Sequence, residues 1–198
     1  MTIYDLKPKF QALLRPIVDG LHAKGITPNQ VTWAALILSI ITGALVAMTH
    51  GARWTLLLIP FVMFIRMALN AIDGILAKEH DMMSDEGAML NELGDVISDV
   101  ALYLPLAFIA GVSPIIVVLF VVVGLFTEVA GILGAVIGKT RRYDGPMGKS
   151  DRAFVVGLLA LLIGLGLTPG WWSDGLLLLS IGLGVITVLN RAKRGLAS

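Results

Sequence analysis

Length, composition and charge place this chain among integral membrane proteins. Of its 198 residues, 57% are hydrophobic and 15% are charged, and the mean hydropathy is +0.87, far above that of a soluble domain. The absence of cysteine excludes disulfides and thiolate metal sites. The formal net charge is +1, and no sequence feature suggests nucleic-acid binding, so we expect no nucleic-acid partner.

The first 24 residues are predicted to form an amphipathic helix that lies along the membrane surface. Four basic residues are separated by apolar ones in this segment, and Pro16 is expected to break the helix. Because the segment lacks an early apolar run, we expect no cleavable signal peptide. Thr27 and Pro28 then fit the N-cap and the first position of the next helix.

Six apolar segments follow, each roughly long enough to cross a bilayer as a helix. They cover residues 29–50, 54–78, 87–110, 114–138, 152–168 and 175–192. No polar linker between them is long enough to separate two folding units. We therefore expect an all-α polytopic membrane protein with six transmembrane helices after the N-terminal amphipathic helix, in a single domain over residues 1–198.

The distribution of basic residues predicts the orientation in the membrane. Six spans place both termini on one side, and every lysine and arginine except Arg53 and Arg66 lies on that side. By the positive-inside rule, both termini and the turn at residues 79–86 are expected in the cytoplasm.

Two polar stripes interrupt the second and third predicted spans, where an ionisable residue indicates a functional site. One stripe consists of Asn70, Asp73 and Ala77, and the other consists of Asn91, Asp95 and Asp99. Spacings of three and four residues put each stripe on one face of its helix. Oxygen ligands converging from two helices suit Mg²⁺ with bound phosphates. Gly74 and Gly87 leave room beside the acids for a ligand or a neighbouring helix.

The residues from Asn70 to Asp95 resemble the signature of the CDP-alcohol phosphotransferase (CDP-alcohol phosphatidyltransferase) superfamily. The signature is Asp, two residues, Asp-Gly, two residues, Ala-Arg, eight residues, Gly, three residues, Asp, three residues, Asp. This chain reads Asn70, Asp73-Gly74, Ala77-Lys78, Gly87, Asn91 and Asp95. All spacings match, but the first and third acids are asparagines and the arginine is a lysine.

The resemblance extends along the whole chain. It includes the segments Thr27-Pro28-Asn29 and Gly148-Lys149-Ser150-Asp151-Arg152. In these features the chain is similar to the YnbA-type branch of the superfamily, from the bacterial inner (cytoplasmic) membrane. That branch implies the same localisation, among membrane lipids, for this chain.

The resemblance implies a transferase of phospholipid biosynthesis. A CDP-linked lipid such as CDP-diacylglycerol would donate its phosphatidyl group to an alcohol acceptor, with release of CMP. One or two Mg²⁺ or Mn²⁺ ions would be held by Asp73 and Asp95, with Asn70 and Asn91 as neutral ligands. Asp95 would also be the catalytic residue that takes the proton from the acceptor hydroxyl, because such transfer combines metal charge with a general base.

The resemblance also implies a nucleotide pocket. It would be shaped by Gly74, Ala77, Lys78 and Gly87, with Asn29 and Thr32 touching the cytidine or the ribose. Lys78 keeps a positive charge but lacks the bidentate fork of arginine. For Asn29 and Thr32, helix capping and packing explain the residues equally well.

The loop from Lys139 to Arg152 holds five basic residues. Topology and contact with anionic lipid would explain them. Alternatively, Arg142, Lys149 and Arg152 would bind an anionic acceptor such as an alcohol phosphate. Glycerol 3-phosphate is the first candidate acceptor, followed by inositol phosphate or another polyol.

A hairpin of the second and third spans predicts which residues lie at the same depth. These pairs are Asp73 with Asn91, Asn70 with Asp95, and Arg66 with Asp99. Asp99 is therefore expected to form a structural ion pair with Arg66, the alternative being that Asp99 replaces a missing metal ligand. Glu128, inside the fourth span, needs a partner that the sequence does not identify.

Two other functions remain open from the sequence. The two asparagines suggest a degenerate family member that binds a CDP-lipid without turnover. An ion or proton pathway would use Asp73, Asp95, Asp99 and Glu128, but it leaves the glycine and alanine spacing unexplained. Glycine-rich stretches at 157–166 and 182–184 predict close helix packing and offer a surface for a homodimer.

Overall fold

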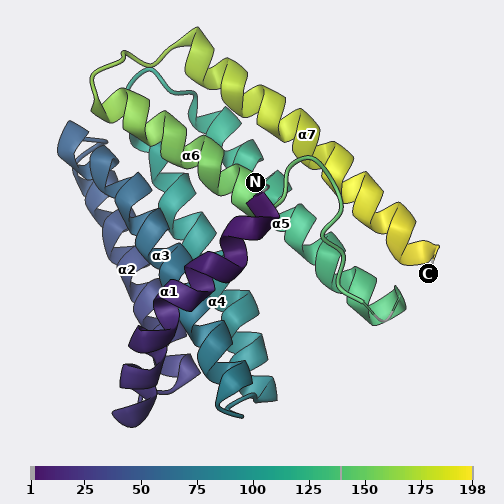
Figure 1. Ribbon diagram of the computed structural model, residues 1–198. Helices are drawn as coiled ribbons and strands as arrows, with labels where there is room; N and C mark the ends of the chain where they lie inside the picture. Colours follow the sequence, from purple (N-terminus) through teal and green to yellow (C-terminus); the bar gives the residue numbers. More distant parts are fainter. Residues whose placement is uncertain (1–2, 139, 198) are drawn as a thin grey trace. The chain divides into compact units, whose positions relative to one another are not determined.

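The computed structural model describes residues 3–138 and 140–197, and these residues form helices and connections without a strand (Figure 1). The helices are α1 (Ile3–Ala23), α2 (Pro28–Met48), α3 (Arg53–Glu79), α4 (Asp85–Tyr103), α5 (Pro114–Gly138), α6 (Lys149–Gly164) and α7 (Trp171–Leu196). A short 3-10 helix, η1 (Leu104–Phe108), follows α4. The predicted all-α fold class is confirmed.

Helices stand at all six places where spans are predicted, but within residues 3–138 and 140–197 four of them are long and apolar enough to cross a membrane. These four are α2, α3, α5 and α7. Helix α6 has 16 residues, which correspond to about 24 Å at 1.5 Å per residue. The predicted third span ends early as an α-helix because Pro105 follows, and η1 continues the chain. Six spans therefore remain a prediction.

The described residues form two compact units, and the boundary between them cuts through α2, α3 and α4. The first unit holds the chain through Ile41 together with Phe61–Ser98, and the second holds Thr42–Pro60 and the chain from Asp99 onward. The first unit contains the whole motif from Asn70 to Asp95, and the second contains α5, α6 and α7. The single-domain organisation stays a prediction.

Helix α1 belongs to the core of the first unit. Leu14 and Val18 of α1 are buried in an apolar cluster with residues of α2 and α3, whereas Leu13 points away and is 72% exposed. The predicted break near Pro16 is wrong, because α1 is continuous from Ile3 to Ala23. A proline removes one backbone hydrogen bond of the helix, and the buried side chains on both sides of Pro16 hold the turn in place.

Polar contacts also join α1 to the end of α3. Arg15 forms an ion pair with Glu79 at 2.9 Å. The rings of His22 and His80 stack with their centroids 3.9 Å apart. An orientation of α1 along the membrane surface stays a prediction.

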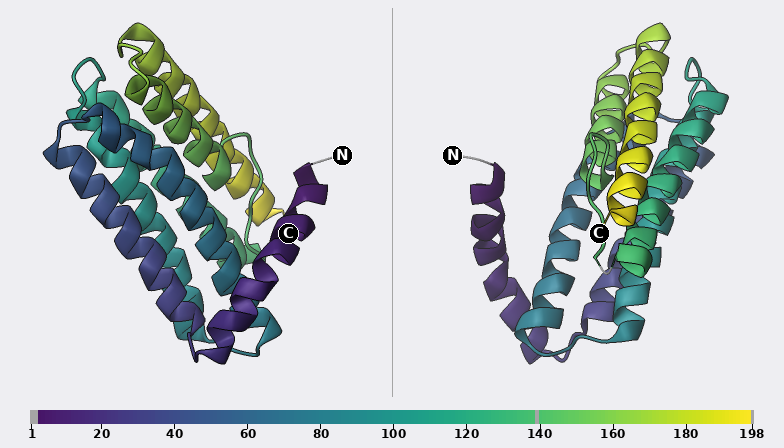
Figure 2. Two further views of the ribbon diagram at one scale, coloured as in Figure 1. Left: turned by 60° about the vertical axis from the view of Figure 1, so that its left-hand side comes forward. Right: turned by 90° about the vertical axis from the view of Figure 1, so that its right-hand side faces the viewer.

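In the second unit, α5, α6 and α7 pack against one another (Figure 2). Gly184 of α7 allows close packing, since a Cβ atom there would lie 2.6 Å from a methyl carbon of Val123 on α5. The predicted close packing of this glycine-rich stretch is confirmed at that position. A Cβ at Gly182 would meet nothing within 4 Å, and a homodimer surface there stays a prediction.

Candidate functional site

Asn70, Asp73, Asn91 and Asp95, which we name the motif site, lie on α3 and α4 within the first unit. The Asn70 amide nitrogen donates to Asp95 Oδ1 at 2.9 Å, so α3 and α4 pair at the predicted depth. A carboxylate oxygen can only accept, so Asn70 must turn its nitrogen toward Asp95. Its amide oxygen therefore points to the other side of the side chain.

Arg66 is the second donor to Asp95. One guanidinium nitrogen, Nη2, lies 3.2 Å from Asp95 Oδ1 and 3.0 Å from the Asp95 carbonyl oxygen. Arg66 is one turn before Asn70 on α3 and is only 5% exposed. The predicted pair of Arg66 with Asp99 would join the two units and stays a prediction.

Asp73 is buried and lies beside α2. Its Oδ2 atom is 3.0 Å from the hydroxyl oxygen of Thr32, which also lies 3.1 Å from the Pro28 carbonyl oxygen. Thr32, which the sequence assigns to nucleotide contact or to packing, thus contacts a motif acid directly. This hydroxyl holds the Asp73 carboxylate in one orientation.

The predicted nucleotide-binding residues lie around these acids. A Cβ atom at Gly87 would lie 2.8 Å from the side-chain oxygen of Asn29, so the structure brings these two residues together. A Cβ at Gly74 would meet nothing within 4 Å, which leaves open space beside Asp73. Lys78 is exposed at the last turn of α3, four residues after Gly74 and therefore on the same face.

The donor chemistry of the motif site fits a hard cation. Mg²⁺ is commonly bound by one or two carboxylates, with substrate phosphates and water completing its shell. Asp73 and Asp95 provide the carboxylates, and Asn70 and the half-buried Asn91 provide amide oxygens. Within the described residues, no group of three or more His, Cys, Asp or Glu side chains could hold a metal ion. The asparagines therefore have to complete any protein shell.

Glu128 of α5 has three arginine partners in the second unit. Its carboxylate lies 2.9 Å from Arg141, 2.9 Å from Arg152 and 3.7 Å from Arg191. Glu128, Arg152 and Arg191 are all buried. The partners that Glu128 needs are thus found, and Arg141 and Arg191 are the two that were not among the predicted site residues. An acid inside an apolar span indicates that a basic partner exists. The sequence does not show which basic residue of the other helices that partner is.

Asp99 belongs to the same group of charges. Its Oδ2 atom lies 3.3 Å from Arg152, whose other terminal nitrogen donates to the Thr127 hydroxyl at 2.6 Å. A structural ion pair of Asp99 is therefore observed, with an arginine of α6. We name Asp99, Glu128, Arg141, Arg152 and Arg191 the arginine network, in which three guanidinium groups face two carboxylates.

The loop before α6 lies against α5. The Arg142 backbone nitrogen donates to the Gly131 carbonyl oxygen at 3.1 Å. A Cβ atom at Gly134 would lie 2.5 Å from Arg142 Cγ, so these glycines make room for the loop. Lys149 is the first residue of α6 and is half-buried. Lys139, in the same predicted basic loop, lies outside the described residues.

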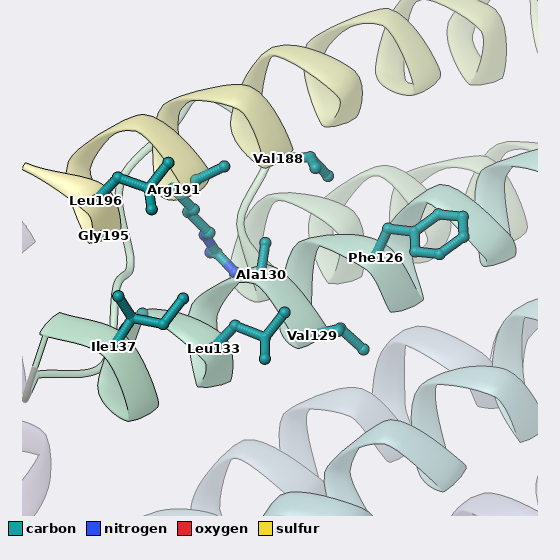
Figure 3. A pocket seen from close by; sticks show the side chains of 11 residues that line it. Phe126, Val129, Ala130, Leu133, Ile137, Val188, Arg191, Gly195 and Leu196 are labelled. Atoms are coloured by element: carbon teal, nitrogen blue, oxygen red, sulfur yellow. The ribbon is translucent and has the colours of Figure 1, made fainter.

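A groove of about 310 Å³ runs between α5 and α7. Its walls are mostly apolar, with Phe126, Leu133 and Ile137 on α5 and Leu196 on α7. Figure 3 shows Arg191 extending from α7 toward α5 in this groove. Its guanidinium group donates to the Thr127 carbonyl oxygen. Among the described residues that line the groove, the one cationic side chain is therefore already engaged by the protein.

Comparisons with known proteins agree on one family and one fold. A family model described as CDP-alcohol phosphatidyltransferase matches residues 25–189. The inner membrane protein YnbA of Escherichia coli K12 is 45% identical over 195 residues, which cover 98% of this chain and 96% of YnbA.

Solved structures resemble the chain at lower identity. A crystal structure of Mycobacterium tuberculosis phosphatidylinositol phosphate synthase (PgsA1) with CDP-DAG bound matches with a TM-score of 0.77 and 22% identity, over 91% of this chain and 92% of that chain. PgsA1 in complex with manganese and citrate also matches with a TM-score of 0.77 and 22% identity, over 91% and 87% of the two chains. This likeness shows the fold.

Proposed function

Because the chain belongs to the CDP-alcohol phosphatidyltransferase family, we propose that it transfers a phosphatidyl group from a CDP-linked lipid to an alcohol acceptor with release of CMP. The observation that carries this proposal is the geometry of the motif site. Asp95 is held across α3 and α4 by Asn70, Asp73 is held by Thr32, and the helix face beside Asp73 is open at Gly74. CDP-diacylglycerol is the proposed donor, in line with the CDP-DAG bound to PgsA1.

The residues of the motif site have different roles in the proposed reaction. Asp73, Asp95 and the amide oxygens of Asn70 and Asn91 would hold Mg²⁺ or Mn²⁺, which supplies positive charge against the diphosphate of the donor. Thr32 fixes the orientation of Asp73. Asp95 takes the proton from the acceptor hydroxyl, which forms a bond to the lipid-linked phosphorus as the bond to CMP breaks. Lys78 contributes a positive charge near the nucleotide.

We propose an acceptor that carries a phosphate group. The arginine network contains one more positive than negative side chain, and Arg142 and Lys149 add further positive charge in the second unit. Arginine binds phosphate through paired N–H donors. Glycerol 3-phosphate is the first candidate, and inositol phosphate or another polyol phosphate is the second. At Arg152, an acceptor phosphate would compete with the carboxylates of Asp99 and Glu128, which the guanidinium group already contacts.

A CDP-lipid-binding protein without turnover is the second candidate function. The observation that favours it is that Asp95 Oδ1 receives both Arg66 and Asn70, so the proposed base already has two N–H donors. Such a protein would retain the nucleotide pocket and bind the donor. It would release no CMP.

The deciding experiment measures CMP release by the purified protein in lipid nanodiscs. The assay contains CDP-diacylglycerol, Mg²⁺ or Mn²⁺, and in turn glycerol 3-phosphate, inositol phosphate and glycerol. Acceptor-dependent release that Asp95→Asn abolishes supports the transferase. Asp85→Asn is the matched control, because Asp85 is exposed on the first turn of the same helix. CDP-lipid binding without release under any condition would instead support the binding protein.

We also propose localisation in a bacterial inner membrane, which the family and the name of YnbA support. The cytoplasmic position of both termini is part of this proposal, since it rests on the distribution of basic residues. Cysteine labelling of single-cysteine variants near each terminus in intact cells would test it, because the chain contains no cysteine of its own.

A further inference from the structure

Arg66 is a fixed cation next to the motif site. It is 5% exposed, and its Nη2 nitrogen contacts both the side-chain and the backbone oxygen of Asp95. A buried guanidinium group holds its charge at all physiological pH values. We propose that Arg66 occupies the role of a second divalent cation at Asp95, so that the site binds a single divalent ion, on the side of Asp73. This inference rests on the proposed function.

The charges of the site support one ion. Asp73 and Asp95 contribute two negative charges, and Arg66 already compensates one of them. With a single divalent ion bound, the net charge of these groups is slightly positive, which suits the negatively charged diphosphate of a CDP-lipid. A second divalent ion on Asp95 would lie next to the guanidinium group in a largely buried site, where repulsion between like charges is weakly screened.

Asn70 fits the same arrangement. Its nitrogen lies 2.9 Å from Asp95 Oδ1, which also accepts from Arg66. A carboxylate at position 70 would place two negatively charged oxygens at this distance and would need an additional cation between them. Asparagine instead donates a hydrogen bond. Arg66 and Asn70 therefore provide Asp95 with positive charge and a donor from the protein itself.

Mn²⁺ stoichiometry tests the inference. Binding of Mn²⁺ to the purified protein, with CDP present, is followed by electron paramagnetic resonance. We expect one ion per wild-type chain and one for Arg66→Lys, which keeps the charge. We expect two ions for Arg66→Gln, together with a larger rise of its unfolding temperature on addition of Mn²⁺ than in the wild type. Arg53→Gln, which removes an exposed arginine from the first turn of the same helix, should behave like the wild type.

The double variant Arg66→Gln/Asp95→Asn covers the case in which Arg66→Gln alone fails to fold. Removing both charges should restore folding, and the double variant should bind one ion. Two ions in the wild type would overturn the inference. So would one ion in a folded Arg66→Gln whose unfolding temperature rises with Mn²⁺ no more than that of the wild type, because Arg66 would then be merely structural.

The metal and activity measurements separate this inference from the proposed function. If the wild type binds no Mn²⁺ in the presence of CDP but still releases CMP, the inference fails and the transferase stands. If the wild type binds one ion and releases no CMP, the inference stands and the transferase fails. Absence of both binding and release would overturn both.

Discussion

Replacing Gly74 with alanine should separate stability from function. Gly74 lies inside α3, and a Cβ atom there would meet nothing within 4 Å. Alanine is favoured over glycine inside a helix by about 0.5–1 kcal/mol, chiefly because glycine loses more backbone entropy on folding. The free energy of unfolding should therefore rise by roughly that amount. No clash within the protein offsets the gain.

The same methyl group should impair binding of the CDP-lipid. Gly74 follows Asp73 directly, so in the proposed function the added carbon occupies space that the donor needs. Inserting a methyl group into a filled site typically costs about 1–3 kcal/mol. At about 1.4 kcal/mol per factor of ten, affinity for the CDP-lipid should fall by about 5- to 150-fold. The loss should appear in the KM for the CDP-lipid.

Two measurements on one protein preparation test this prediction. Unfolding in detergent gives the stability, and CMP release at varied CDP-diacylglycerol gives KM. Gly182→Ala is the matched control, because Gly182 lies inside α7 and its Cβ would also meet nothing within 4 Å. It should gain stability and keep its KM. An unchanged KM in Gly74→Ala would refute the reasoning, as would an equal loss in Gly182→Ala.

Three further substitutions test the packing and the charges, each by its free energy of unfolding in detergent. Arg152→Ala should lower it by about 3–5 kcal/mol, because two buried carboxylates lose their shared cation. Thr32→Val should lower it by about 1.5–3 kcal/mol, because a hydrogen bond to the charged Asp73 is lost. Leu14→Ala should lower it by about 2–5 kcal/mol, whereas exposed Leu13→Ala should change it little.

Each of these has an outcome that contradicts its reasoning. If adding Glu128→Gln to Arg152→Ala does not recover part of the lost stability, the arginine network is not the cause of the loss. Thr32→Ser should keep the wild-type stability, and a loss equal to that of Thr32→Val would point to packing rather than to the hydroxyl. Equal effects of the two leucine substitutions would mean that α1 does not pack as described.

The sequence alone was sufficient for the parts of this protein that depend on local spacing. Helical periodicity placed Asn70 and Asp95 on facing stripes, and the observed hydrogen bond between them confirms that register. Apolar segments located helices at all six expected places. Both inferences use repeats within one helix or one hairpin, where three- and four-residue spacing and turn length limit the choices.

Local rules were less reliable where packing outweighs them. Pro16 was expected to break the first helix, but buried contacts of Leu14 and Val18 keep α1 continuous across it. Pro105 did limit the α-helical part of the third predicted span, although Leu102 and Leu106 beside it are buried as deeply as the neighbours of Pro16. Burial of the neighbouring side chains alone therefore does not decide whether an α-helix continues through a proline.

Only the tertiary structure identified the partners of the buried charges. Glu128 faces arginines from the loop, from α6 and from α7, and Asp99 faces Arg152, which is 53 positions away. These pairs depend on how each helix is rotated about its own axis, and a sequence of apolar spans does not specify that rotation. A buried charge requires a partner on physical grounds, but the packing of distant helices selects which residue it is.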